Sequence, residues 1–144
     1  MKPSQIRAEL LEQHAALRGL IKDVRCAIEE RSAREELRGC VERLATALRG
    51  HNKYEEGVLR ELIKNVDAWG PARVEIMDES HVDEHTEVLA ALLGTSGASD
   101  VAAAGKGVAA VLGRIESHMA REEEVLLGED VLRDDDIVIE YIGG

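Results

Sequence analysis

A chain of 144 residues suits one domain around a single hydrophobic core. Its composition, 44% hydrophobic and 33% charged, indicates a globular rather than a disordered chain. The net charge of -11 and the lack of a basic stripe argue against nucleic acid and anionic membranes as partners. Because only two prolines occur, an all-α fold is favoured. No secretory signal or membrane-spanning run is recognised, so a cytoplasmic location is expected.

Apolar residues at spacings of three and four predict a first helix over about residues 4–31, with His14 on its buried stripe. The second helix is expected to start at Ser32, which forms an S-x-x-E capping box with Glu35. The same spacing then continues until a Gly-Pro turn at residues 70–71.

The third helix is expected to follow this turn and to end in the Gly/Ser-rich loop at residues 94–99. The fourth begins with an alanine-rich stretch that contains Gly105 and Gly107. Four amphipathic helices with short loops predict an up-down-up-down antiparallel four-helix bundle over residues 1–130, followed by a C-terminal tail over 131–144 that is docked on the bundle or extends from it. A monomer is expected, and pairing of bundles stays open.

In the first and second helices, and again in the second and third, the candidate ligands lie at similar distances in sequence from the connecting loop, so antiparallel packing brings them to the same level. In the third and fourth helices these distances differ, because His85 lies closer to the end of its helix than His118 lies to the start of the next. Either the fourth helix extends past its neighbour, or its glycine-containing start is not helical.

One motif, H-x-x-x-E-E-x-V-L, occurs twice, at His51 with Glu55 and at His118 with Glu122. Positions i and i+4 of a helix lie on the same face, so each copy presents an imidazole and a carboxylate to one point. The inward-facing stripes thus hold every histidine of the chain and two glutamates. The candidate metal ligands are His14, His51, Glu55, His81, His85, His118 and Glu122.

A single histidine on an apolar face is usually a core residue with a hydrogen-bond partner. Seven ionisable groups in one core are harder to explain this way, because burying each of them without a partner costs about 1 kcal/mol to several. Metal ions satisfy neutral imidazoles and ionised carboxylates together. Seven ligands exceed a structural zinc site and suit two adjacent metals with bridging carboxylates. A di-iron centre fits the donors best, and zinc is the substitute.

Other residues near these motifs have simpler interpretations. Glu56, Glu123 and Glu124 neighbour the candidate ligands but lie off the stripes, so they are expected to be solvated surface charges. Cys26 and Cys40 are expected to be reduced and in or near the core, and a contact between them across the first helix hairpin is the alternative.

The order of these residues resembles the hemerythrin-like HHE cation-binding family, over about residues 10–127. The resemblance implies that His81, His85 and His118 hold one iron, and that His14 and His51 hold the other. It also implies that the two glutamates bridge, with an oxo or hydroxo group between the irons and an open position for a small ligand. The last carboxylate here is four residues after its histidine, as in bacterial HHE-type members, whereas the oxygen carriers place Asp at the fifth position.

The function expected is binding of dioxygen, a related diatomic molecule or peroxide at the open iron, for storage, delivery or sensing. No general acid or base is recognised on the stripes beyond the ligands, so a binding protein is favoured over an enzyme. Consumption of peroxide or nitric oxide, an iron- or redox-responsive regulatory role, and a metal-free structural bundle are the alternatives.

Overall fold

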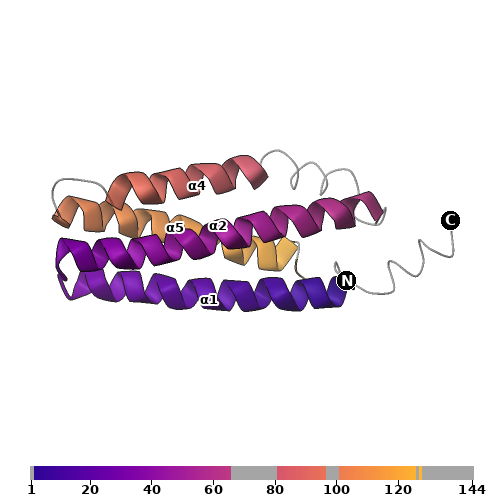
Figure 1. Ribbon diagram of the computed structural model, residues 1–144, viewed down its shortest axis with the longest axis horizontal. Helices are drawn as coiled ribbons and strands as arrows, with labels where there is room; N and C mark the ends of the chain where they lie inside the picture. Colours follow the sequence, from indigo (N-terminus) through magenta and orange to yellow (C-terminus); the bar gives the residue numbers. More distant parts are fainter. Residues whose placement is uncertain (1, 66–80, 97–100, 126, 128–144) are drawn as a thin grey trace.

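The computed structural model describes residues 2–65, 81–96, 101–125 and 127. This part of the chain forms four helices and no strand, which confirms the all-α expectation. The helices are α1 (Pro3–Glu29), α2 (Arg34–Asn65), α4 (His81–Ser96) and α5 (Val101–Val125). They lie side by side, and their colours progress in alternating directions, compatible with the up-down-up-down order (Figure 1). The turn predicted at residues 70–71, the start of the third helix, the capping position at 99–100 and the tail over 131–144 lie outside the described residues.

Each helix packs against two neighbours, because the main contacts run between α1 and α2, α2 and α4, α4 and α5, and α5 and α1. The residues that fill the space between them are those of the predicted stripes. On α1 and α2 the buried apolar side chains include Ile6, Leu10, Leu17, Ile21, Val24, Leu37, Val41, Leu44 and Leu48, and on α4 and α5 Val88, Leu92, Val108, Val111, Leu112 and Ile115.

The turn between α1 and α2 differs from the sequence prediction. Arg31 has a positive φ of 51°, and the Ser32 N–H donates back to the carbonyl of Ala27, which closes α1 with a Schellman-type end. Because Ser32 thereby belongs to the end of α1, helix α2 starts later, and the Ala33 carbonyl accepts its first hydrogen bonds. The predicted capping box at Ser32 and Glu35 was therefore wrong.

The glycine-containing start of α5 is helical, since α5 begins at Val101 and continues through Gly105 and Gly107. Gly105 is buried beside Ile28 near the end of α1. Of the two possibilities left open by the sequence, the structure therefore shows that α5 extends past the shorter helix α4.

At the opposite end, α5 is joined to the beginning of α1. The Arg7 Nε atom donates to the Leu127 carbonyl at 2.6 Å, and the Leu127 side chain is buried. This contact holds the C-terminal end of α5, close to the second His-Glu motif, against α1.

Both cysteines are free, and Cys40 is buried as expected, whereas Cys26 is exposed rather than part of the core. None of the described helices has the length and apolar character needed to cross a membrane.

Candidate metal centre

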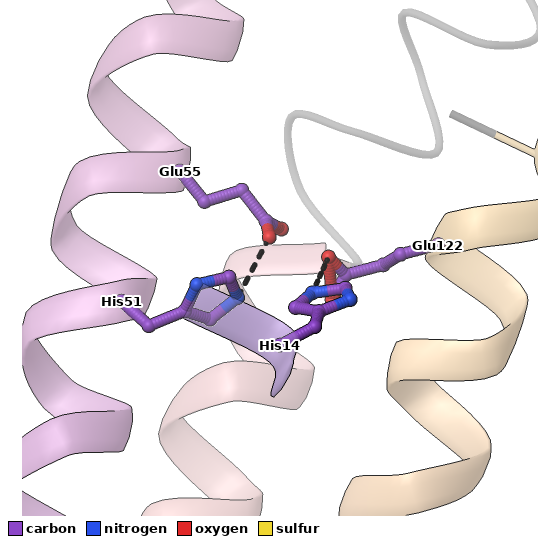
Figure 2. Close-up of side chains that lie close together, drawn as sticks. All are labelled: His14, His51, Glu55 and Glu122. Carbon is purple, nitrogen blue, oxygen red and sulfur yellow. Dashed lines mark ion pairs between the residues drawn. The ribbon is translucent and has the colours of Figure 1, made fainter. Parts of the chain in front are cut away.

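Four side chains from three helices converge near the middle of the bundle. His14 of α1, His51 and Glu55 of α2, and Glu122 of α5 each offer one donor atom within 4.8 Å of the others. Figure 2 shows both imidazoles and both carboxylates turned toward a common centre. All four residues are buried, and Glu55 is fully inaccessible. This group could hold one metal ion.

A second group of the same kind lies beside the first. Glu55 and Glu122 also lie within 4.8 Å of donor atoms from His85 of α4 and His118 of α5. The two groups therefore share both carboxylates, and each adds its own pair of histidines. His81 is the first residue of α4, but its side chain lies outside the described part of the structure, so its role as a ligand stays a prediction.

The two His-Glu motifs have the geometry that helical spacing predicts. Nε2 of His51 is 2.9 Å from a carboxylate oxygen of Glu55, and Nε2 of His118 is 2.6 Å from one of Glu122. Each pair occupies consecutive turns of one helix, so the imidazole and the carboxylate meet on the buried face.

Several of these inward atoms are buried without a well-aligned hydrogen bond. They include Nε2 of His14, Nε2 of His51 and both carboxylate oxygens of Glu122. Charged neighbours approach them closely, yet the atoms point toward shared centres rather than along donor–acceptor lines. Buried polar atoms normally have a partner, and a metal cation supplies one for neutral imidazoles and carboxylates together. The donor set therefore fits a metal ion.

Electrostatics keeps the shared carboxylate charged. Burial alone would raise the pKa of Glu122, but contacts with Glu55 and with the surrounding histidines hold it well below its ordinary value of 4.5. Burial would lower the pKa of His118, yet its contact with Glu122 prevails and raises this pKa to about 9. In the metal-free protein His118 therefore carries a proton at neutral pH, which a bound metal must displace.

The outer nitrogens of the histidines have their own partners on neighbouring helices. Nδ1 of His14 on α1 lies 3.1 Å from a carboxylate oxygen of Glu123 on α5. Nδ1 of His51 on α2 lies 2.7 Å from the amide oxygen of Gln13 on α1. With Nε2 turned inward, Nδ1 carries the hydrogen and donates it, which fixes the orientation of each ring.

The other two histidines complete the pattern. Nδ1 of His85 on α4 lies 2.9 Å from a carboxylate oxygen of Glu56 on α2. Nδ1 of His118 on α5 lies 3.2 Å from one of Glu84 on α4. Each of the four contacts joins a histidine to an acceptor on an adjacent helix. Together they connect α1 to α5, α5 to α4, α4 to α2, and α2 to α1. We call the four partners the acceptor ring: Gln13, Glu56, Glu84 and Glu123.

The acceptor ring corrects one prediction and adds two residues that sequence reasoning missed. Glu56 and Glu123 are not free surface charges but partners of histidines, whereas Glu124 is exposed as expected. Gln13 and Glu84 were not singled out at all. A sequence signal was present, because each member of the acceptor ring directly precedes or follows a candidate ligand.

A small cavity of about 10 Å³ adjoins the candidate ligands. That volume is close to what one water molecule needs. Its walls combine His51, Glu84, His85, His118 and Glu122 with the apolar side chains of Leu48, Val88, Ile115 and Met119 and with the amide of Asn52. Asn52 is 8% exposed, and its Oδ1 atom has no hydrogen-bond partner.

One comparison with known proteins returned a match. A family model for the hemerythrin HHE cation-binding domain matches residues 5–129, a range that contains every candidate ligand and the whole acceptor ring. No curated protein and no solved structure matches the chain.

Proposed function

Because the chain belongs to the hemerythrin HHE cation-binding family, we propose that it is a di-iron protein that binds dioxygen or a related small molecule. One observation carries the proposal: the two ligand groups share Glu55 and Glu122. Two carboxylates common to two sets of imidazoles are the arrangement that bridges a pair of metal ions in a helix bundle. Such a pair, when bound, supplies reversible coordination of a small ligand at an open position.

The donor atoms favour iron. Imidazole nitrogens and carboxylate oxygens suit iron and zinc, whereas calcium and magnesium prefer oxygen donors alone. Neither group contains a thiolate, which the commonest structural zinc sites use. Zinc remains the substitute that an elemental analysis distinguishes from iron.

The cavity limits what can reach the centre. A space of about 10 Å³ has room for an occupant about the size of one water molecule, so a small ligand needs less rearrangement of the side chains than a bulky substrate does. Its walls are apolar side chains apart from the candidate ligands, Glu84 and Asn52. Small neutral molecules such as dioxygen fit these walls better than larger or charged substrates do.

Binding is favoured over catalysis because the ionisable groups of the cavity are already assigned to the candidate metal centre. Each of them in the described structure is either a candidate ligand or, as Glu84, the partner of one. This leaves none of them to transfer protons to or from a substrate. Storage, delivery or sensing of the small molecule follows as the role.

The test is elemental analysis with an ultraviolet–visible spectrum of protein purified aerobically from iron-supplemented cells. We expect about two irons per chain, near-ultraviolet absorption from the bridged ferric pair, and a spectral change on adding azide. Protein without metal, or with a single zinc ion, would contradict the proposal. Steady consumption of peroxide or nitric oxide would instead assign the same centre to an enzyme.

A matched pair of variants on α5 links the metal to the shared carboxylate. Glu122→Gln removes one of the two shared ligands, so we expect iron content to fall at least about tenfold. Glu116→Gln alters a glutamate of the same helix that pairs with Arg25 at the surface, and it should leave iron content unchanged. Equal iron content in the two variants would show that Glu122 does not hold the metal.

A further inference from the structure

The acceptor ring supports the two histidine pairs with different chemistry. At the first pair, His51 donates to the uncharged amide of Gln13. His14 donates to Glu123, but Arg18 also donates to both oxygens of that carboxylate at 2.7 Å. The formal charges of the acceptors and of the arginine therefore cancel at the His14–His51 position.

At the second pair, both acceptors are carboxylates. His85 donates to Glu56, and His118 lies beside Glu84. Among the described residues neither glutamate has an ion pair with an arginine or a lysine. In the described part of the structure, the His85–His118 position therefore has two carboxylate partners without a neighbouring cation, whereas the His14–His51 position has none of this kind.

This difference matters to a cation. A carboxylate that accepts a hydrogen bond from a metal-binding imidazole raises the basicity of that imidazole, and it adds attraction to the metal charge. An amide oxygen polarises the imidazole less than a carboxylate does. A carboxylate that is paired with a guanidinium is partly neutralised, so it attracts the imidazole hydrogen and the metal charge less strongly. The outer partners of metal-binding histidines typically change metal affinity by about 10–100-fold.

We propose that the acceptor ring weakens the His14–His51 position for a divalent cation relative to the His85–His118 position, beyond any difference that His81 makes as a ligand, so that the His14–His51 position fills second and empties first. The inference rests on the proposed two-metal function and adds an order of loading to it. Gln13 and Arg18 act as positioning residues, because neither one belongs to the candidate ligand groups and each acts through a histidine or its partner.

The chain offers a test that conserves charge. The Gln13 amide nitrogen donates to the Glu9 carboxylate at 3.1 Å, one turn earlier on α1. Exchanging the two residues, as Glu9→Gln with Gln13→Glu, keeps the net charge and the pair of side chains. It moves the carboxylate from the solvent side of this contact to the side that faces His51.

Arg18 offers a second test with a matched control. Arg18→Gln removes the guanidinium and leaves the Glu123 carboxylate to His14 alone. Arg25→Gln removes another arginine of α1 that pairs with a glutamate of α5, Glu116, but does not contact a histidine. A difference between these variants reports on the support of His14 rather than on the loss of an arginine.

The experiment is calorimetric titration of the metal-free protein with zinc(II), in competition with a chelator where binding is tight. For the wild type we expect two binding events whose dissociation constants differ by about tenfold or more. His14→Ala should abolish the weaker event and leave the tighter one. The Glu9/Gln13 exchange and Arg18→Gln should each tighten the weaker event by about tenfold and change the tighter one by less than about threefold. Arg25→Gln should change neither.

Three results would overturn the inference: loss of the tighter event in His14→Ala, weaker events that neither the exchange nor Arg18→Gln tightens, or two equal events in the wild type. A wild type that binds one zinc ion or none would overturn the proposed function as well. Circular dichroism of each metal-free variant verifies that the helices are retained. The Glu9/Gln13 exchange and Arg18→Gln alter the same position independently, so the test still decides if one of them does not fold.

Discussion

At the residue scale, Asn52 differs from every other polar side chain that borders the candidate centre. It is one residue after His51 and lines the cavity, but its Oδ1 atom has no partner and is not grouped with the candidate ligands. A buried amide oxygen without a hydrogen bond costs about 1–3 kcal/mol. Unless the cavity supplies a partner, Asn52 therefore reduces the stability of the metal-free protein.

Replacing Asn52 by Leu tests this cost. We expect the free energy of unfolding of the metal-free protein to rise by about 1 kcal/mol, because the substitution removes an unpaired carbonyl and adds apolar contact with the cavity wall. Urea denaturation measures the change, and Asn52→Ala is the control, because it removes the carbonyl but leaves a larger void. A lower free energy of unfolding for Asn52→Leu than for the wild type would contradict this expectation.

The spacing of the candidate ligands could be predicted from the sequence, whereas their outer partners could not. His51 and Glu55 are four residues apart on a buried stripe, and helical geometry alone brings them together. Glu56 lies one position off that stripe, where a helix faces its neighbour. Whether such a side chain points to solvent or reaches across to His85 depends on the separation and rotation of two helices, which spacing along one helix does not specify.

At the element scale, the turn between α1 and α2 shows that backbone geometry decides where one helix ends and the next begins. Arg31 adopts a left-handed conformation that glycine accepts without strain but that other residues adopt at a cost. The Ser32 N–H then closes α1, so the helix start predicted from its side chain is displaced along the chain. Both the end signal and the start signal were local, and the backbone geometry of the turn decided between them.

Arg31→Gly should stabilise the protein. We expect the free energy of unfolding to rise by about 0.5–1 kcal/mol, because relief of the positive φ outweighs the greater flexibility of glycine in the unfolded chain. The midpoint of urea denaturation measures this, and Arg34→Gly, in the first turn of α2, should lower stability instead. A lower midpoint for Arg31→Gly would mean that the arginine side chain contributes contacts worth more than the strain.

The start of α5 shows the limit of propensity at this scale. Gly105 and Gly107 weaken a helix by about 1 kcal/mol each relative to alanine, so the sequence left the start of α5 open. Packing decides the outcome, because this segment lies against the end of α1, where Gly105 is buried beside Ile28. Tertiary contacts of this kind are not visible in the composition of the segment itself.

At the scale of the whole molecule, protons and metal ions compete for the same core. In the metal-free protein, burial opposes protonation of His14, His85 and His118, but contacts with carboxylates prevail and raise the pKa of each imidazole. Metal binding requires the same imidazoles to be neutral. The state that stabilises the metal-free bundle is therefore the state that excludes the metal.

This competition gives a pH dependence with a definite sign. The pKa of His118 rises from 6.5 to about 9 on folding, so its contribution to stability is complete below pH 6.5 and is lost as the pH rises toward 9. The lowered pKa of Glu122 contributes stability above pH 4.5 that is lost as the pH falls below it. We therefore expect the metal-free protein to be most stable between these limits and to weaken toward pH 9.

Urea denaturation with and without a chelator, at about pH 5.5, 7 and 8.5, measures this dependence. The stabilisation that metal provides should grow with pH, because fewer protons must be displaced. Stability of the metal-free protein that increases from the lowest to the highest of these pH values would contradict the expectation. So would a metal effect that is the same at all three.

The acceptor ring also has a consequence for the biosynthesis of the protein. The contact from His14 to Glu123 spans 109 residues, and it joins α1 to α5. Because both ligand groups also include Glu122 of α5, neither can be complete on a nascent chain in which α5 has not yet been made. Each candidate metal position is therefore complete only once α5 has been synthesised and has packed against α1, whereas the contacts of Gln13 with His51 and of Glu56 with His85 can form before then.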